Sequence, residues 1–511
     1  MTHQTGNYSR VAKNTLLLYL RMFLIMAVSL YTSRAILAAL GVVDFGVYNV
    51  VAGVITVFGV LSGAMTGATQ RYLSFELAKG DPDRLRLTFS TCVNIFLIIA
   101  ALVVVVGEPV GIWFIREKLI IPPNRLTAAY WVFHFSVLTM VVMVISIPYN
   151  AAIVAHEKMS AFAYISIVDV VLRLAIVFLL YAICFDRLIV YAGLLCLTQI
   201  AIRLIYNWYC GRHFVETKYR LVWDGRLIRE IAIFSAWNLW GNGAYLLYTQ
   251  GVNILLNTFF GPVVNAARGV AAQVQSAILV FSGNFQVAIN PQITKSYACG
   301  ELGYMHGLIF RSSKFSCLML ACLGFPIFVE ITPILNLWLT DVPQHTAVFV
   351  RIMICTSIFG SMANPFKIGA QATGNVKVFQ AVNGGILLLI VPVAYVALRM
   401  GGEPWTVFAV HLVIEIIAGC AALCILSPMI QMPVRDYCRH VLLRCLWTVV
   451  AAVPVPVALH FLLPPFTLKW VVVGLLCGLS MLAASWLVGL TPGERQFVAT
   501  KVRTRLKRAH K

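Results

Sequence analysis

Charged side chains inside long apolar segments are the residues of this chain best placed to do chemistry. Charge is costly in lipid, so such residues usually face a bundle interior or a watery cavity and mark a function. Arg21, Arg268 and Lys367 have no obvious partner nearby in the sequence, and Arg34 lies just beyond the first apolar segment. These four cations predict a cavity that binds an anion, and the planar donors of arginine suit phosphate. The alternative is that each cation meets a backbone carbonyl or a distant acid.

The deep acids are fewer than the deep cations. Asp169 and Arg173 stand one helical turn apart, which predicts a local ion pair. Glu415 has no assigned role. Three further charged residues lie near the ends of predicted helices, where we expect them to snorkel toward the headgroups: Arg203, Arg351 and Glu330.

Uncharged polar side chains recur at helical spacing inside the apolar segments, so each set lies on one face of its helix. The predicted cavity lining is Asn49, Thr56, Asn238, Asn242, Tyr245, Asn253 and Gln275. Hydrogen bonding between packed helices is the competing explanation for these stripes.

An enzyme is not indicated. The histidines are scattered without metal-ligand spacing, no G-x-S-x-G motif is present, and the 13 cysteines include no C-x-x-C pair. A phosphate-binding G-x-x-x-x-G-K-[ST] loop is absent too, which argues against ATP as the energy source. We therefore expect no catalytic residues, no cofactor and no metal.

The elements that must position these residues are transmembrane helices. The chain is 60% hydrophobic and only 11% charged, and crossing a bilayer takes about 20 apolar residues. The predicted spans are 14–33, 45–66, 87–107, 126–147, 160–184, 188–209, 231–256, 267–289, 313–336, 347–366, 378–398, 406–427, 443–463 and 468–490. The predicted fold class is thus an all-α polytopic membrane protein with about 14 transmembrane helices.

Charge outside the spans predicts the orientation. With an even number of spans both termini share one side, and most lysines and arginines of the loops and tails lie on that side. The positive-inside rule places it in the cytoplasm, so we expect a multi-pass protein of the bacterial inner membrane. The net charge of +20 indicates contact with anionic headgroups rather than with nucleic acid, above all for the tail 495–511.

A weak internal repeat predicts two lobes. Phe45-Gly46 and Phe260-Gly261 each open a polar-striped span, about six helices apart. Even spacing preserves orientation, so the copies form parallel repeats related by a pseudo-two-fold axis along the membrane normal. We expect an N-terminal lobe of six helices, a C-terminal lobe of six helices, and two appended helices with a basic tail: 1–229, 230–428 and 429–511.

Four segments carry a likeness to a known family: PYNAAIVAHEKMSAFAYISI (148–167), FGPVVNAARGVAAQVQ (260–275), NFQVAINPQITKSYACGE (284–301) and ILNLWLTDVP (334–343). They resemble the Wzx-type polysaccharide and O-antigen flippases of the multidrug/oligosaccharidyl-lipid/polysaccharide (MOP) exporter superfamily. With the fourteen-span layout, the likeness extends over nearly the whole chain.

The resemblance implies a transporter that moves an undecaprenyl-diphosphate-linked oligosaccharide across the inner membrane for lipopolysaccharide, capsule or exopolysaccharide biosynthesis. The anionic diphosphate would ride in the cation-lined cavity during alternating access. Its partners would be the bilayer, the lipid-linked oligosaccharide and, in an assembly, a glycan polymerase and a chain-length regulator. The sugar composition, the coupling ion and the oligomeric state stay open.

Other functions remain as alternatives. A cation-coupled multidrug exporter of the same superfamily usually carries buried acids in its first lobe, whereas the first helix here carries Arg21. A peptidoglycan lipid-precursor flippase would share the cationic lumen. A membrane-bound glycosyltransferase or glycan polymerase would need a sizeable loop domain, and a scaffolding protein would not need aligned polar stripes.

Overall fold

A computed structural model of the chain describes residues 59–117, 122–182, 185–339, 342–454 and 469–496, together with single residues between 19 and 51 and at 456 and 458. In this part of the chain the regular structure is helical, and no β-strand occurs. The predicted fold class, an all-α polytopic membrane protein, is confirmed.

Ten helices of the described residues are long and apolar enough to cross a membrane. They are Pro82–Glu117, Pro123–Ala155, Met159–Tyr181, Arg187–His213, Val263–Ala298, Leu302–Val329, Thr346–Thr373, Lys377–Arg399, Thr406–Ile430 and Lys469–Gly489. Each contains most or all of one predicted span. The predicted spans 14–33, 45–66 and 443–463 lie partly outside the described residues.

Two predicted spans differ from the structure. The seventh falls within α7 (Gly225–Phe260), which is not among the ten apolar helices because polar side chains recur along it. The ninth, 313–336, is not one helix: α9 (Leu302–Val329) ends, and a separate short helix, α10 (Ile331–Trp338), follows Glu330. Glu330 has non-helical backbone angles, φ −103° and ψ 30°, which interrupt the helix.

The helices fall into two compact units. Unit 1 comprises residues 1–243, 287–301 and 374–377, and unit 2 comprises 244–286, 302–373 and 378–511. Both α7 and α8 (Pro262–Ala298) contribute residues to each unit.

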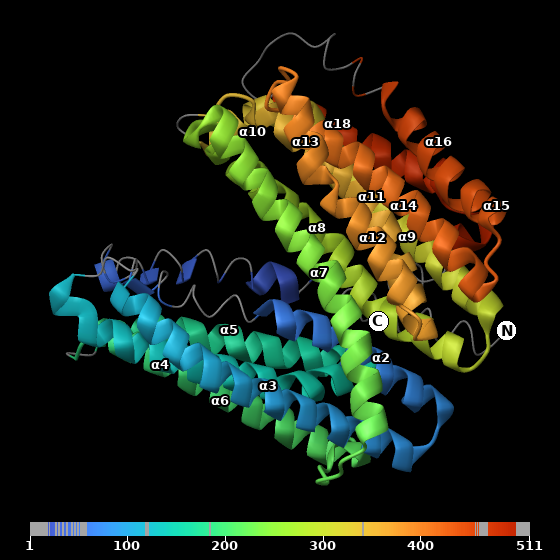
Figure 1. The fold of residues 1–511 in the computed structure, drawn as a ribbon. Helices are drawn as coiled ribbons and strands as arrows, with labels where there is room; N and C mark the ends of the chain where they lie inside the picture. The colour runs from blue at the N-terminus through green and yellow to red at the C-terminus, as the bar shows by residue number, and fades with distance from the viewer. Residues whose placement is uncertain are drawn as a thin grey trace, which may run out of the picture. The chain divides into compact units, whose positions relative to one another are not determined.

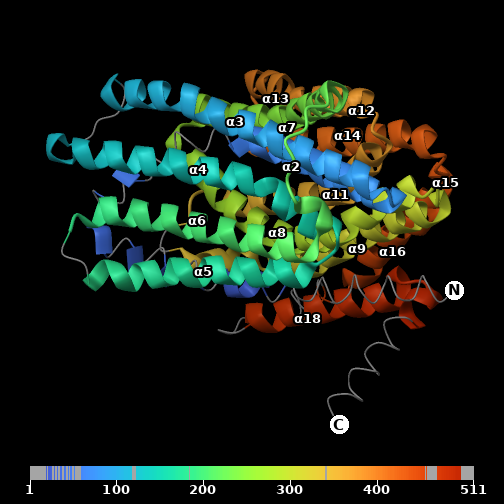
Figure 2. The ribbon, with the colours of Figure 1, turned by 90° about the horizontal axis from the view of Figure 1, so that it is seen from below.

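Unit 1 is built around a bundle of long helices that run alongside one another (Figures 1 and 2). They are α2 (Gly59–Lys79), α3 (Pro82–Glu117), α4 (Leu126–Ala155), α5 (Met159–Ala182) and α6 (Arg187–His213). Phe96, Phe133 and Leu188 belong to the buried core that joins α3, α4 and α6. Acidic side chains cap two of these helices: Asp81 accepts from the first turn of α3, and Asp186 from Leu188 N of α6.

Unit 2 contains a second apolar core. Phe349 of α11 (Thr346–Thr373) and Phe408 of α14 (Thr406–Ile430) lie in this core with ring centroids 4.3 Å apart. The other helices after α10 are α12 (Lys377–Leu388), α13 (Ile390–Arg399), α15 (Val434–Tyr437), α16 (Leu443–Ala452) and α18 (Lys469–Ala484). Short 3-10 or π segments are Pro123–Arg125, Val215–Thr217, Cys438–Leu442 and Ser485–Gly489.

Turns with a left-handed backbone repeat along the chain. Gly41 and Gly261 both have φ of 79°, and Gly80 and Gly300 both have φ of 75°, so each pair is separated by 220 residues. Glycine suits these positions because it adopts positive φ without steric cost. The turn geometry therefore repeats at an offset slightly larger than the 215 residues predicted from Phe45-Gly46, two residues outside the described part of the chain.

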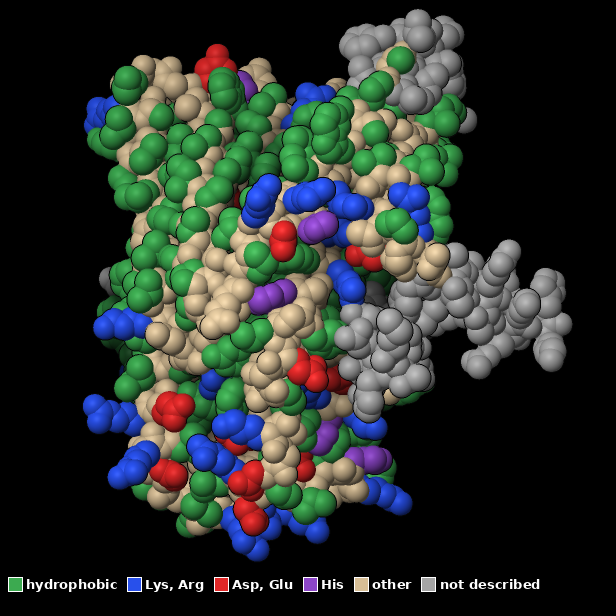
Figure 3. All heavy atoms as spheres, turned by 90° about the vertical axis from the view of Figure 1, so that its right-hand side faces the viewer, with side chains coloured by type: hydrophobic (Ala, Val, Ile, Leu, Met, Phe, Trp, Pro, Cys, Tyr) green, Lys and Arg blue, Asp and Glu red, His purple; other side chains and the backbone are tan. Residues whose placement is uncertain are grey.

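Large apolar side chains are exposed along many helices, including Trp131, Phe178 and Leu204. Figure 3 shows one face on which hydrophobic side chains cover broad areas while charged side chains gather in groups. Exposed apolar surface of this kind matches helices that contact lipid.

Candidate functional site

Two helices of unit 1 carry polar side chains on one face each. On α5, Phe162, Ser166, Asp169 and Arg173 follow each other at steps of four, three and four residues, and on α6, Gln199, Arg203, Tyr206 and Cys210 do the same. This spacing puts each set along one side of its helix.

Asp169 joins the two polar faces. Its Oδ1 accepts a hydrogen bond from Gln199 Nε2 of α6 at 3.2 Å, and its Oδ2 accepts one from Arg173 Nε of α5 at 3.1 Å. The ion pair expected from the spacing of Asp169 and Arg173 is present in the structure. The Asp169 carboxylate is thus held between the Arg173 guanidinium and the Gln199 amide.

Arg21 lies against this face from the N-terminal part of unit 1. Its guanidinium carbon stands 4.4 Å from the ring centroid of Phe162, a cation–π geometry. It also interacts electrostatically with Tyr206. Its Nε is buried and has no hydrogen-bond acceptor within the described part of the chain.

Arg203, like Arg21, lies over an aromatic ring. Its guanidinium carbon stands 3.8 Å from the ring centroid of Tyr149, and its Nη1 is buried without an acceptor. Tyr149 is held in place by an edge contact with Phe89, ring centroids 5.2 Å apart, and its carbonyl accepts from Cys210 Sγ. The stacking on Tyr149 does not test the expectation that Arg203 snorkels toward the headgroups, which stays a prediction.

We call Arg21, Arg173, Arg203, Asp169, Gln199 and Tyr206 the arginine cluster. Its three arginines outnumber its one aspartate, so the cluster has an excess of positive charge. A buried donor without a partner costs about 1–3 kcal/mol. An oxyanion that accepted from either nitrogen, Arg21 Nε or Arg203 Nη1, would remove this cost at that donor, and phosphate is the anion best matched to arginine donors.

The predicted cation Arg268 has a different setting, in unit 2. Its two Nη atoms donate to Asn253 Oδ1 and to the Thr249 carbonyl, the latter at 2.9 Å. Both acceptors lie on α7, the helix that precedes the Arg268 helix α8. The alternative weighed from the sequence, that a cation meets a carbonyl, therefore applies to Arg268. Lys367 is half-buried on α11 and is not free either.

The predicted polar lining is spread over both units. Gln275 Nε2 donates to Ser357 Oγ of α11 at 2.9 Å, and the buried Asn238 donates to the Phe234 carbonyl at 3.1 Å. Tyr245 is exposed, with its ring centroid 5.3 Å from that of Tyr248. Asn242 is half-buried and has interactions of its own.

Three predicted site residues lie outside the described part of the chain: Arg34, Asn49 and Thr56. Among the residues predicted to snorkel, Glu330 is buried, and Arg351 donates from Nε to the Phe328 carbonyl at 3.0 Å. The residues missed by sequence reasoning are Tyr149, Phe162, Gln199 and Tyr206. The four-three-four spacing on α5 and α6 is the signal that could have found three of them.

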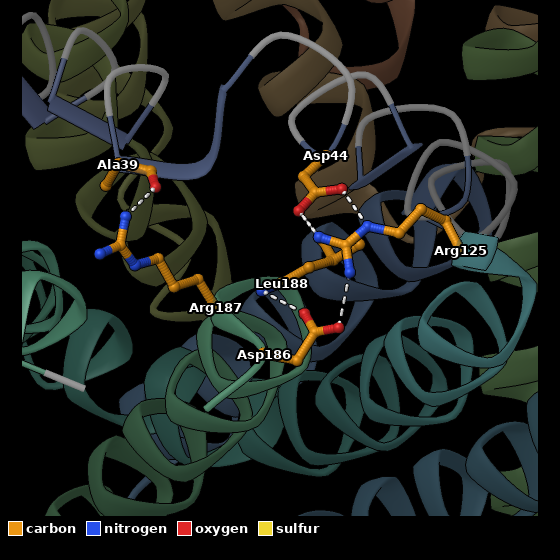
Figure 4. A network of polar contacts seen from close by, with 6 residues as sticks. All are labelled: Ala39, Asp44, Arg125, Asp186, Arg187 and Leu188. Carbon is orange, nitrogen blue, oxygen red and sulfur yellow. Dashed lines mark hydrogen bonds and ion pairs between the residues drawn. The ribbon is translucent and has the colours of Figure 1, made fainter. Parts of the chain in front are cut away.

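In a second polar network of unit 1, both arginines have acceptors (Figure 4). Arg125 donates through Nε to Asp44 at 2.7 Å and through Nη1 to Asp186 at 2.7 Å. Arg187 Nη1 donates to the Ala39 carbonyl at 3.1 Å. These contacts tie the starts of α4 and α6 to residues 39 and 44, so the network serves to hold helix ends.

The described residues contain no group of three or more His, Cys, Asp or Glu side chains that could hold a metal ion. The arginine cluster has more cations than acids, so its charge suits an anion better than a cation.

The comparisons with known proteins identify the fold. No protein-family model and no curated protein matches the sequence. The bent form of the Vibrio cholerae MATE transporter VcmN matches with a TM-score of 0.72 at 15% identity, covering 86% of this chain and 100% of that chain. A MATE structure in the straight conformation matches with a TM-score of 0.70 at 12% identity, covering 83% of this chain and 96% of that chain.

A MOP superfamily transporter from Pyrococcus furiosus, described as having a binding pocket of reverse polarity that suggests a different function, matches as well. Its TM-score is 0.65 at 12% identity, covering 82% of this chain and 96% of that chain. At these identities the likeness concerns the fold, which is that of MATE transporters of the MOP superfamily.

Proposed function

We propose that this chain transports an anionic, lipid-linked oligosaccharide, an undecaprenyl diphosphate derivative, across the bacterial inner membrane with both termini in the cytoplasm. The observation that carries the proposal is two buried guanidinium nitrogens, Arg21 Nε and Arg203 Nη1, that have no acceptor among the described residues. The diphosphate is the part of the substrate that these donors bind, while the polyprenyl chain stays in lipid.

Two further observations support this substrate class. The fold is that of MATE transporters, and the segments quoted above resemble Wzx-type flippases. The Pyrococcus furiosus structure, described as having a binding pocket of reverse polarity, indicates that pockets of different polarity occur in this fold. On this proposal the sugars serve lipopolysaccharide, capsule or exopolysaccharide, and a glycan polymerase and chain-length regulator are the expected partners.

A multidrug exporter is the competing function, because one structure with this fold is described as a multidrug resistance MATE family transporter. A cationic drug would need an available acid. Asp169 is the acid of the arginine cluster, and both of its oxygens are engaged by Arg173 and Gln199. The excess of arginine would also repel a cation.

The test measures binding of undecaprenyl diphosphate to the purified protein in lipid nanodiscs. We expect the double variant Arg21→Gln, Arg203→Gln to lose about 100-fold in affinity, since each lost charge-assisted hydrogen bond removes about 1.4 kcal/mol or more. Arg212→Gln is the matched control, because Arg212 is an exposed arginine on the same helix α6. Equal affinity of the double variant and the control would refute the proposal.

A deletion strain provides the cellular counterpart. Accumulation of an undecaprenyl-diphosphate oligosaccharide on the cytoplasmic leaflet, with loss of surface glycan, is the expected phenotype. Intact surface glycan with new sensitivity to cationic drugs would favour the multidrug exporter instead.

A further inference from the structure

The link between α6 and α7, within unit 1, contains a segment without regular structure that lies against α3. Near the start of this segment, Arg86 Nε of α3 donates to the Lys218 carbonyl at 3.0 Å. One helical turn further along α3, Ser90 Oγ accepts from the Arg220 amide at 3.3 Å. Four residues of helix and two residues of extended chain both span about 6–7 Å, so the segment runs along α3 in a nearly extended form.

Asn94 of α3 holds the far end of the segment. Its Nδ2 donates to the Val222 carbonyl at 2.7 Å, and its Oδ1 accepts from Tyr219 Oη at 2.7 Å. The predicted span 87–107 begins about two helical turns before Asn94, so this end of the segment lies at the edge of the membrane. Backbone groups at that depth need hydrogen-bond partners, and the side chains of α3 supply them.

Two large apolar side chains are exposed on the segment that α3 holds in place. Leu221 is 84% exposed and Trp223 is 69% exposed. Such exposure is unfavourable in water. At a membrane–water interface, by contrast, tryptophan is enriched, because its ring contacts apolar chains while its N–H stays near polar groups.

Basic side chains flank Leu221 and Trp223. They are exposed, and they are Lys218, Arg220, Arg226 and Arg229. Lysine and arginine at this level of a membrane protein are attracted to anionic lipids.

The three acids in and beside the segment are engaged within the protein. Asp224 Oδ1 caps α7 by accepting from two amides of its first turn, at 2.9 and 3.1 Å. Glu216 pairs with His156, and Glu230 Oε1 accepts from Tyr72 Oη at 3.2 Å. The four exposed cations therefore give this surface an excess of positive charge.

We propose that residues 218–229 bind the anionic surface of the bilayer, with Leu221 and Trp223 inserted among the headgroups and the four basic side chains in contact with lipid phosphates. The bilayer is the partner because the segment lies beside α3 and directly after α6, two helices that can cross a membrane. The positive-inside rule predicts the leaflet to be the cytoplasmic one, whose surface is negatively charged.

The first test measures how the purified protein retains phosphatidylglycerol over phosphatidylethanolamine after release from nanodiscs that contain both lipids, by native mass spectrometry. The double variant Arg220→Gln, Arg226→Gln should lower this ratio about tenfold. The matched control is Arg435→Gln, Arg439→Gln, which removes the same charge from two exposed arginines elsewhere in the chain. Equal losses in the two double variants would overturn the proposal.

The second test locates the Trp223 ring by fluorine NMR of protein that carries fluorotryptophan in nanodiscs. The resonance missing from Trp223→Phe is that of Trp223. We expect a lipid that is spin-labelled near its headgroup to broaden this resonance more strongly than a water-soluble gadolinium chelate does. Stronger broadening by the chelate would overturn the insertion and indicate a protein partner for this surface instead. Neither test uses undecaprenyl diphosphate, so a failure here is distinguishable from a failure of the proposed substrate.

Discussion

The arginine cluster of unit 1 and the His411–Glu415 pair of unit 2 use the same local motif, two charged side chains one turn apart on a helix, in opposite ways. In unit 1 the acid is neutralised by Arg173, and two further arginines keep buried donors available. In unit 2 the acid faces a side chain that can itself lose or gain charge. The two acids therefore differ in their neighbour: Asp169 lies beside an arginine, which is always charged, and Glu415 beside a histidine, which is not.

Two arginines differ in the same way in the hydrogen-bond donors that they leave for a ligand. Arg268 and Arg21 both lie within polar-striped segments, yet both Nη atoms of Arg268 already have acceptors on α7. Arg21 instead has an aromatic ring beneath it and a buried Nε without an acceptor. A cation is available to a ligand when its donors are not already used by the protein.

The largest expected effect concerns a carboxylate that, like Asp169, is paired with a basic side chain. Glu494 Oε2 accepts from Lys314 Nζ at 2.6 Å and from Thr491 N at 2.8 Å, and the Lys314 side chain is only 4% exposed. Replacing Glu494 by alanine leaves Lys314 buried and unpaired, so we expect a loss of about 3–5 kcal/mol in the free energy of unfolding. The exposed Glu301→Ala is the control; equal losses would contradict the argument.

The same residue predicts a pH dependence. Burial acts to raise the pKa of Glu494, but the hydrogen bonds from Lys314 and the Thr491 amide outweigh it and hold the pKa below its ordinary value. A carboxylate with a depressed pKa in the folded state stabilises the protein above its unfolded pKa and loses that contribution as the pH falls through the folded pKa. Thermal melts should therefore show an acid destabilisation below about pH 4.5 that Glu494→Gln reduces.

A smaller effect is expected on ligand affinity, and it should differ between Arg21 and Arg268. Arg21→Gln should weaken undecaprenyl diphosphate binding about tenfold, because a donor available to the ligand is lost. Arg268→Gln should weaken it by less than about threefold, since its donors are already bound within the protein. Titration of both variants in nanodiscs gives the comparison, and a larger loss for Arg268→Gln would reverse our assignment of the binding residues.

Asp169→Asn should change the affinity for undecaprenyl diphosphate in the opposite direction, toward tighter binding. Removing the one acid of the arginine cluster increases its positive charge, so we expect undecaprenyl diphosphate to bind about threefold more tightly. Glu415→Gln, which removes an acid from unit 2, should leave this affinity within experimental error. Weaker binding in Asp169→Asn would show that the acid positions Arg173 for the ligand.

The smallest effect tests the packing of Glu415. Gly360→Ala places a Cβ against Glu415 Oε1, and the carboxylate must move by a few tenths of an ångström. We expect the thermal unfolding midpoint to shift downward by less than about 2 °C, because the side chain can adjust to the added methyl group. Gly419→Ala is the control, since its Cβ would make only an ordinary contact, 3.7 Å from Ala363. An equal shift in both variants would show that Gly360 has no particular role.

The sequence by itself determined the features that depend on short stretches of chain. Apolar runs predicted the membrane-crossing helices, and the one-turn spacing of Asp169 and Arg173 predicted their ion pair, because neighbours on one helix are set by its pitch. The pair His411 and Glu415 has the same one-turn spacing, so the sequence alone could have predicted it as well.

Only the tertiary structure decided which charges remain available. Arg203 stacks on Tyr149, and Gln199 bonds to Asp169 on another helix, contacts that join residues far apart in sequence. Arg268 finds its acceptors on α7 and not on its own helix. Side chains on different helices meet only after the helices pack. That packing depends on contacts between apolar surfaces, which the spacing of the polar residues does not predict.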